Sequence, residues 1–287
     1  MKVAIIPNLT RKNALAVTKE ICQWLTVYGA EFAFRTFDRN LESEIPNIRF
    51  MEFPELVVWC DAVISVGGDG TMLTCAKSIV DYKKPVLCIN AGRLAFMAGL
   101  ESDELSLLKK LIDGEYTEDH RMLLEVSIYR EGEEVYSNHV INDVVVARGI
   151  EMRMCDLDLA CDGRHIASYH ADGIIVATPT GSSAYTFSAG GPIIDPQLEG
   201  IVVTPICAHS VFSRPIVFNP DNRLTLTCSE EARYTDLLLS VDGEPSVELK
   251  KGDIIKVYKS LRYANFIRIK HENFFEILKK KMSKTED

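Results

Sequence analysis

A glycine-rich loop with one carboxylate in it, Gly67-Gly68-Asp69-Gly70-Thr71, directly follows the apolar run at residues 62–66. Glycines have no Cβ, so the main-chain N–H groups of such a loop can approach a polyphosphate closely. A helix that begins here adds unpaired N–H donors and a favourable dipole end. Asp69 would repel phosphate unless it served a metal or accepted a proton from an attacking hydroxyl. The loop therefore indicates phosphoryl transfer, although such turns also arise for steric reasons alone.

A second cluster, at residues 172–192, is rich in small hydroxyl side chains. A predicted strand ends there in a Thr-Pro-Thr-Gly turn, and a helix is expected to begin with Ser182, Ser183, Tyr185, Thr186 and Ser188. Hydroxyls bind sugar hydroxyls and amides without adding charge, and a tyrosine ring offers a flat apolar face. The cluster favours a polar ligand with a sugar. The alternative is a glycine-rich connection whose hydroxyls only cap a helix.

A third candidate is the pair Asn142-Asp143, which leads into a predicted strand at residues 144–147. An amide beside a carboxylate can hold the two hydroxyls of a ribose. An Asn-Asp pair at this position is also a common turn, so the pair carries little weight by itself.

Composition limits the class of protein. The chain has 287 residues, a formal charge of -9 and a pI near 5.3, which argues against a nucleic-acid-binding protein. The eight cysteines form no Cys-x-x-Cys pair, so zinc and redox motifs are not indicated, and thiols in a reducing compartment fit best. No apolar stretch reaches the roughly 18 residues of a membrane span, and the N-terminus has no secretory pattern. We expect a cytoplasmic protein that binds neither nucleic acid nor membrane.

The elements that must position these residues fall into two groups. The first hundred residues alternate strands and helices, which predicts an α/β domain with a parallel sheet and ligands at the carboxyl ends of its strands. The expected strands are 3–6, 62–66 and 86–89, and the expected helices are 13–28, 71–80 and 104–112. The loop Asn90-Ala91-Gly92 follows the third strand and is expected at the same edge.

Beyond this point strands dominate, and Asp-Gly and Glu-Gly turns punctuate them. The expected strands are 123–129, 144–147, 157–161, 173–177, 201–206, 224–228 and 237–241, and a helix is expected at 273–282. This pattern predicts an all-β, antiparallel, sandwich-like domain. We place the α/β domain at residues 1–100 and the larger β-rich domain at 101–266, with a C-terminal helix in 267–287 packing back on the first domain.

Taken together, the three clusters resemble the NAD kinase family, whose members carry GGDGT, an Asn-Glu pair and a TPTGSTAYSLSAGGP-like segment in this order. The resemblance extends to residues 90–96, 204–210, 213–217 and 240–244, and so covers most of the chain. It implies ATP-dependent phosphorylation of NAD at the 2′-hydroxyl of its adenosine ribose, giving NADP, with a divalent metal, usually Mg²⁺, accompanying ATP. It also implies an α/β domain followed by a β-rich NAD-binding domain, and a homo-oligomer, commonly a tetramer.

The resemblance also implies roles for single residues. Asp69 would be the general base, and Gly67, Gly68, Gly70 and Thr71 would form the phosphate loop for ATP. The residues that would contact NAD are Asp69, Gly70, Asn142, Asp143, Arg153, His170, Asp172, Ser183, Ala184, Tyr185, Thr186, Phe187, Ser188 and Glu244. Glu244 matches a polar contact that a neighbouring turn or another subunit supplies. No metal ligand is assigned.

This chain departs from the family pattern at three positions. Asp143 stands where the family usually has Glu, and is one methylene shorter; Ser183 replaces Thr, and Ala95 replaces Gly. Two other functions share part of the pattern. Lipid kinases of the diacylglycerol or sphingosine type have a GGDGT loop and a similar layout, but not a segment suited to a dinucleotide. A sensor of NAD or NADP would use the loop only to bind anions.

Overall fold

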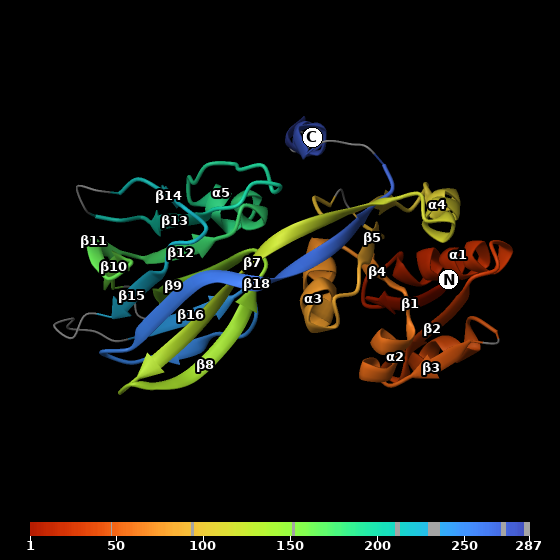
Figure 1. Cartoon of the computed structure of the whole chain (residues 1–287), viewed down its shortest axis with the longest axis horizontal. Coiled ribbons are helices and arrows are strands. Elements are labelled where there is room, and N and C mark those ends of the chain that lie inside the picture. Colours follow the sequence, from red (N-terminus) through yellow and green to blue (C-terminus); the bar gives the residue numbers. More distant parts are fainter. Residues whose placement is uncertain are drawn as a thin grey trace. The chain divides into compact units, whose positions relative to one another are not determined.

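The computed structural model describes residues 1–46, 48–92, 95–150, 153–209, 213–228, 236–270 and 274–283. The chain divides into two compact units (Figure 1). The N-terminal unit contains Met1–His120 and Ala264–Asp287, and the β-rich unit contains Arg121–Tyr263. The first unit is therefore made of two segments that are distant in sequence. We describe each unit by itself.

The N-terminal unit is an α/β domain with a parallel sheet, as the sequence predicted. Its strands lie in the order β5-β4-β1-β2-β3, and β6 and the end of β18 also pair with β5. The strands are β1 Lys2–Pro7, β2 Glu31–Arg35, β3 Arg49–Met51, β4 Ala62–Gly67, β5 Val86–Asn90 and β6 Leu100–Glu101. The helices are α1 Ala14–Val27, η1 Thr36–Ser43, α2 Phe53–Trp59, α3 Asp69–Ile79, η2 Val80–Tyr82, η3 Leu105–Leu107, α4 Leu108–Asp113 and α6 Phe274–Ser283.

The central strands β4 and β5 are buried at every residue, because helices cover a parallel sheet on both faces. Side chains of α1, η3 and α4 share one core with alternate residues of β1 and β4. The end of β18 and the residues after it complete this core with Ile267 and Ile269, which are 1% and 4% exposed. The end of strand β18 is thus a structural part of the first unit.

The β-rich unit is a sandwich of two sheets. One sheet has the order β14-β13-β12-β9-β16-β17, and its pairings are antiparallel. The other contains β11-β10-β15-β18, with β7 beside β18 and β8 beside β7. The strands are β7 Thr117–Arg130, β8 Glu133–Val140, β9 Asp143–Arg148, β10 Cys155–Cys161, β11 Arg164–Ala171, β12 Gly173–Ala177, β13 Ile201–Ile206, β14 Ile216–Phe218, β15 Leu224–Cys228, β16 Leu237–Val241, β17 Val247–Leu249 and β18 Ile254–Arg268.

One hydrophobic core holds the two sheets together. Val144 and Val176 from the first sheet and Leu157, Leu226 and Val257 from the second belong to it. The predicted antiparallel sandwich is confirmed. Its Glu131-Gly132, Asp162-Gly163 and Asp242-Gly243 turns have positive φ at both residues, as type I′ turns require.

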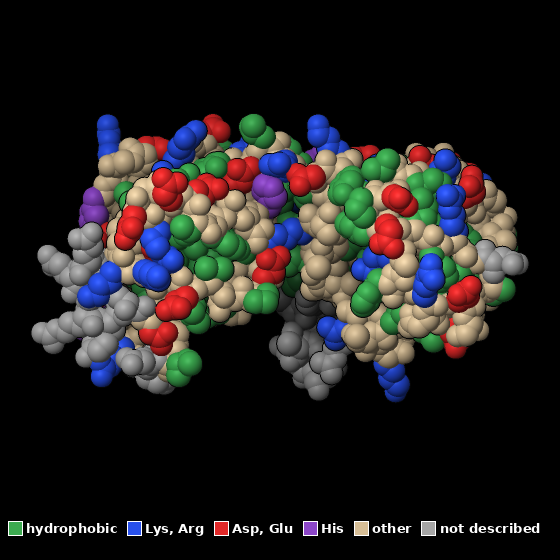
Figure 2. All heavy atoms as spheres, turned by 90° about the horizontal axis from the view of Figure 1, so that it is seen from below, with side chains coloured by type: hydrophobic (Ala, Val, Ile, Leu, Met, Phe, Trp, Pro, Cys, Tyr) green, Lys and Arg blue, Asp and Glu red, His purple; other side chains and the backbone are tan. Residues whose placement is uncertain are grey.

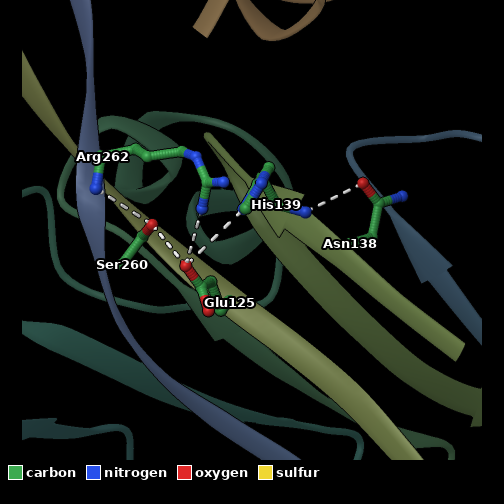
Figure 3. A network of polar contacts seen from close by, with 5 residues as sticks. All are labelled: Glu125, Asn138, His139, Ser260 and Arg262. Atoms are coloured by element: carbon green, nitrogen blue, oxygen red, sulfur yellow. Dashed lines mark hydrogen bonds and ion pairs between the residues drawn. The ribbon is translucent and has the colours of Figure 1, made fainter. Parts of the chain in front are cut away.

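A polar network ties β7, β8 and β18 together on the face away from this core (Figure 3). The buried hydroxyl of Ser260 donates to Glu125 Oε1 at 2.8 Å and accepts the backbone N–H of Arg262 at 3.1 Å. The Arg262 guanidinium lies 3.4 Å from the same carboxylate, and His139 Nδ1 lies 3.9 Å from it. Glu125 and His139 are direct cross-strand partners, so the carboxylate links three strands.

Candidate active site

The glycine loop lies where β4 ends and α3 begins. β4 ends at Gly67, Gly68 caps the helix with extended backbone, and Asp69 is the first helical residue. The helix therefore begins two residues earlier than the predicted start at Thr71. A Cβ added at Gly67 would come within 2.6 Å of the Thr71 side chain, whereas one at Gly68 or Gly70 would meet nothing within 4 Å. Only glycine fits at position 67, whereas there is open space beside the backbone at Gly68 and Gly70.

Neighbouring strand ends hold this loop in place. The Asn8 side-chain amide, just after β1, donates to Thr71 Oγ1 at 2.9 Å. The backbone N–H of Met97 donates to Asp69 Oδ1 at 3.0 Å and so fixes the orientation of the carboxylate. Within this unit the carboxyl ends of β1, β4 and β5 meet, as expected for ligand sites in open parallel sheets.

A hydrogen-bonded chain, which the sequence patterns did not reveal, supports the turn after β5. Asn90 is 1% exposed; its amide donates to Glu101 Oε2 at 2.7 Å, and its oxygen accepts the N–H of Gly92 at 3.0 Å. Glu104 in turn accepts the Glu101 N–H and is paired with Lys270 at 2.7 Å. Burial raises the pKa of Glu101. Lys270 is far from the other residues in sequence, and Glu101 and Glu104 belong to no motif, so no sequence pattern indicated these contacts.

In the β-rich unit, Asn142 and Asp143 stand at the start of β9. The carboxylate of Asp242 accepts three successive backbone N–H groups, those of Ile141, Asn142 and Asp143, at 3.0, 2.7 and 3.2 Å. The N–H of Asp242 returns to the Asp143 carbonyl at 2.9 Å. The Asp242-Gly243 sequence predicted only a turn, yet its carboxylate fixes the backbone of the Asn-Asp pair.

The Thr-Pro-Thr-Gly turn packs directly on the same backbone. Thr178 donates its N–H to the Asn142 carbonyl at 2.9 Å and its hydroxyl to the Ile141 carbonyl at 2.5 Å. A Cβ at Gly181 would come 2.1 Å from the Asn142 carbonyl oxygen, so only glycine allows this approach. Two of the sequence clusters are thus brought into contact within the β-rich unit.

The carboxyl group of Asp143 lies inside this junction and is 7% exposed. Burial and, second, the negative charge of Asp242 raise its pKa to about 7, while the backbone of Tyr185 acts in the opposite direction. Tyr185 is the first residue of helix α5, Tyr185–Ser188, which follows η4, Thr180–Ser183.

The segment 183–188 presents its aromatic side chains and buries some of its hydroxyls. Tyr185 and Phe187 are each 46% exposed, whereas Thr186 is fully buried. Ser183 Oγ donates to the Thr180 carbonyl at 3.4 Å. Ala184 is half-buried and Ser188 is exposed. The buried Ser182 hydroxyl, which the resemblance does not assign to NAD, bonds the Pro179 carbonyl at 2.6 Å and the Ile194 N–H at 3.0 Å.

The remaining predicted NAD contacts lie at two other places in the β-rich unit. Asp172 pairs with Arg148 at 2.8 Å, and the exposed His170 pairs with Asp156 at 2.7 Å. Arg148 is the last residue of β9 and Asp143 the first, and the strand rises by about 16 Å between them. Asp172, which pairs with Arg148, and Asp143 therefore lie at opposite ends of β9. Glu244 accepts from the Asn138 amide at 2.9 Å, just after the Asp242 turn.

Arg153, another of the predicted NAD contacts, is exposed. Three residues of the sequence motifs, Arg93, Leu94 and Ser210, lie outside the described residues.

Acidic and basic side chains are interspersed on the face drawn in Figure 2. Among the helices that the structure describes, none has the length and apolar character to cross a membrane. Within the same described ranges, no group of three or more His, Cys, Asp or Glu side chains is arranged to hold a metal ion.

Known proteins match this chain over nearly its whole length. The family models for the ATP-NAD kinase N-terminal and C-terminal domains match residues 3–116 and 141–269. NAD kinases from Thermoanaerobacter sp. (strain X514) and Caldanaerobacter subterraneus subsp. tengcongensis are 36% identical over 284 residues and 37% identical over 289 residues; each match covers 98% of this chain and 99% of the relative.

Two solved structures share the fold. The crystal structure of yeast NADH kinase complexed with NADH matches with a TM-score of 0.90 at 24% identity, covering 99% of this chain and 87% of that one. The NAD kinase from Archaeoglobus fulgidus in complex with ATP matches with a TM-score of 0.76 at 25% identity, covering 98% of each chain. With both domain models matched and relatives above one-third identity along its length, this chain belongs to the ATP-NAD kinase family.

Proposed function

We propose that the protein transfers the terminal phosphoryl group of ATP to the 2′-hydroxyl of the adenosine ribose of NAD, giving NADP. The observation that carries this proposal is Asp69, a carboxylate held by a backbone N–H at the start of a helix, in a loop that is open above Gly68 and Gly70. Membership of the ATP-NAD kinase family supports the choice of substrates. The Archaeoglobus relative was crystallised with ATP.

In this reaction Asp69 acts as the general base. Phosphoryl transfer passes through a loose transition state, so catalysis depends mostly on positioning and on neutralising charge. Main-chain donors of the loop at residues 67–71 suit the phosphate groups, because they lie at the N-terminus of α3. The Met97 N–H keeps one oxygen of Asp69 fixed, and the carboxylate accepts the proton of the ribose hydroxyl as phosphorus is attacked.

The β-rich unit supplies the NAD contacts. Asn142 and the exposed rings of Tyr185 and Phe187 suit the adenosine end, through amide hydrogen bonds to ribose and apolar contact with a base. Asp172 and His170, at the other end of β9, suit the nicotinamide end. The two ends of β9 are about 16 Å apart, so the adenosine and nicotinamide contacts would lie at separate places along one strand. Ser183, Ala184 and Ser188 form the wall between, and Arg153 and Glu244 add polar contacts. Thr186, which the resemblance also assigned to NAD, is fully buried and presents no surface to a ligand.

The reaction also requires a divalent cation, Mg²⁺ in our proposal. Magnesium usually keeps several waters and binds through one or two carboxylates and the substrate's phosphates, so it does not need an all-protein cage. The described residues fit this mode: they contain no three-ligand cluster, while the phosphate loop carries a single carboxylate, Asp69. When bound with ATP, the cation supplies charge neutralisation on the transferring group.

We further propose a cytoplasmic homo-oligomer, a tetramer as in the family, with residues 101–266 as the NAD-binding domain. Six of the eight cysteines are buried free thiols, in keeping with a reducing compartment. Light scattering coupled to gel filtration measures the oligomeric state directly.

A coupled assay tests the function. Purified protein is incubated with ATP, Mg²⁺ and NAD, and an NADP-specific dehydrogenase reports the product. We expect NADP only when all three are present. Parallel reactions with diacylglycerol or sphingosine as acceptor distinguish a lipid kinase. NAD binding by calorimetry without any NADP formation would instead indicate a sensor.

A further inference from the structure

The end of strand β18 contacts the loop that holds the Asp69 carboxylate. Met97 donates its backbone N–H to Asp69 Oδ1, so the position of this residue decides where one carboxylate oxygen lies. The guanidinium of Arg268, the last residue of β18, donates through Nη1 to the Ala98 carbonyl at 3.1 Å. Met97 and Ala98 are adjacent, and all four residues belong to the N-terminal unit. The two hydrogen bonds therefore act on one short stretch of backbone.

Two further contacts on this loop come from the same part of the chain. The Gly99 N–H donates to a β5 carbonyl at 2.8 Å, and a Cβ at Gly99 would come 2.9 Å from the Ile267 carbonyl oxygen. The aromatic rings of Phe96 and Phe274 lie with their centroids 6.5 Å apart. Residues 96, 98 and 99 therefore each contact the last part of the chain, whereas residue 97 holds the carboxylate.

A residue of the neighbouring strand orients the Arg268 guanidinium. Its Nε donates to Asp119 Oδ2 of β7 at 3.1 Å, and the side chains of Arg268 and Asp119 are only 19% and 10% exposed. The donors of a planar guanidinium point in fixed directions, so this ion pair aims Nη1 at the Ala98 carbonyl. A lysine ammonium would keep the positive charge here without these fixed directions.

We propose that Arg268 is a positioning residue for Asp69: it fixes the loop at residues 96–99, whose Met97 N–H holds the carboxylate ready to accept a proton. The kinetic consequence rests on the proposed function, in which Asp69 is the general base. A movement of the backbone at residue 97 would release Oδ1, and a misplacement of about 1 Å can lower a rate about a hundredfold. Arg268 acts through the loop, so the binding of ATP and NAD should not depend on it.

The direct test is NMR of the ligand-free protein labelled with ¹⁵N-methionine, which contains 8 methionines and so gives few amide signals. Met97→Leu removes one signal and thereby assigns it. We expect the Met97 amide proton to shift upfield in Arg268→Ala, as in Asp69→Ala, where the acceptor itself is removed. Arg268→Lys should give an intermediate shift. The control Arg39→Ala, at an exposed arginine of the same unit, should give none. A Met97 signal that stays unchanged in Arg268→Ala overturns the proposal.

A double-mutant cycle gives the kinetic test. Arg268→Ala should lower kcat by about 10- to 100-fold and change the KM values for NAD and ATP by no more than about threefold. In the Asp69→Asn background the base is absent, so the same substitution should lower kcat by no more than about a further threefold. Losses that multiply would show that Arg268 acts independently of Asp69, and a raised KM for ATP would show that it contacts the nucleotide. Either result refutes the proposal.

Folding is checked separately, because removing one partner of a largely buried ion pair can destabilise a protein. Urea unfolding is measured for each variant. Arg268→Lys keeps the charge beside Asp119, and it takes the place of Arg268→Ala in both tests if the alanine variant does not fold. A protein that makes no NADP, but whose Met97 amide responds as stated, would refute the proposed function and leave the positioning role intact. NADP formation with an unchanged Met97 amide in the Arg268 variants would do the reverse.

Discussion

At the residue scale, two carboxylates of this protein have opposite environments. Asp69 stands at a helix N-terminus in an open loop, whereas Asp143 is buried beside a second carboxylate. The first environment suits a group that must meet a substrate hydroxyl, and the second raises the pKa of the buried carboxyl. The sequence predicted the chemistry of Asp69 from its glycine neighbours. It could not predict the burial of Asp143, because Asp242, Thr178 and Tyr185 are distant in sequence.

Replacing Asp69 by Asn should remove the general base while keeping the side chain's size and its ability to accept the Met97 N–H. We expect kcat to fall by about 10²- to 10⁴-fold, with NAD affinity changed little. Single-turnover kinetics and calorimetry measure the two quantities. Asp103→Asn, at an exposed carboxylate of the same unit, is the control. An Asp69→Asn protein with near-normal turnover would disprove the assignment.

Asp143 should also make stability depend on pH. Its pKa is about 7 in the folded protein and 3.8 in a model peptide, so the folded state binds the extra proton between these values. The free energy of unfolding should therefore fall as pH rises from about 4 to about 7, by at most about 4 kcal/mol from this group. Asp143→Asn should flatten that slope, and Asp221→Asn should not. Urea unfolding at pH 5 and pH 8 measures the difference, and parallel slopes for all three proteins would contradict the pKa.

At the scale of elements, the sequence pattern predicted some strands of the protein and missed others. The strands with continuous apolar runs, such as β4, β12 and β13, were predicted almost to the residue. The strands β8, β11 and β18 were missed, because they carry charged or polar side chains at solvent-facing positions. Their strand structure is decided by cross-strand pairing and by partners such as Glu125 and Ser260.

At Gly181, η4 packs directly against the backbone just before β9. An alanine Cβ there would lie 2.1 Å from a backbone oxygen that cannot move without disturbing β9. We expect Gly181→Ala to lower the free energy of unfolding by about 2–4 kcal/mol and to raise the KM for NAD. Gly200→Ala, whose Cβ would meet its nearest atom at 3.4 Å, is the control. If urea unfolding showed equal effects for both variants, the close approach would not be required.

At the scale of the whole molecule, the N-terminal unit contains segments that lie before and after the β-rich unit in the sequence. The sequence pattern predicted a domain boundary near residue 100, where alternating strands and helices give way to strands. The compact units instead divide between residues 120 and 121 and again between 263 and 264. Strands β7 and β18 each extend past such a boundary, and sequence texture cannot distinguish the two parts of one continuous strand. The family, in contrast, could be recognised from short motifs alone.

The N-terminal unit should require the end of the chain. Ending the protein after Tyr263 removes Ile267 and Ile269 from its core, and Lys270 from its ion pair with Glu104. We expect the truncated protein to lose the cooperative unfolding of this unit and to become sensitive to protease at the α1 and α4 surfaces. A truncation after Ser283 should behave like the full chain. Equal resistance of both truncated forms would contradict this expectation.

This arrangement has a consequence for biosynthesis. The segment that contains the glycine loop is translated before the β-rich unit, but residues 267–270, which complete its core, are translated after that unit. The nascent N-terminal unit must wait, partly assembled, while more than a hundred residues of the intervening sandwich are made. Phosphoryl-transfer chemistry can therefore begin only after the whole β-rich unit has been translated.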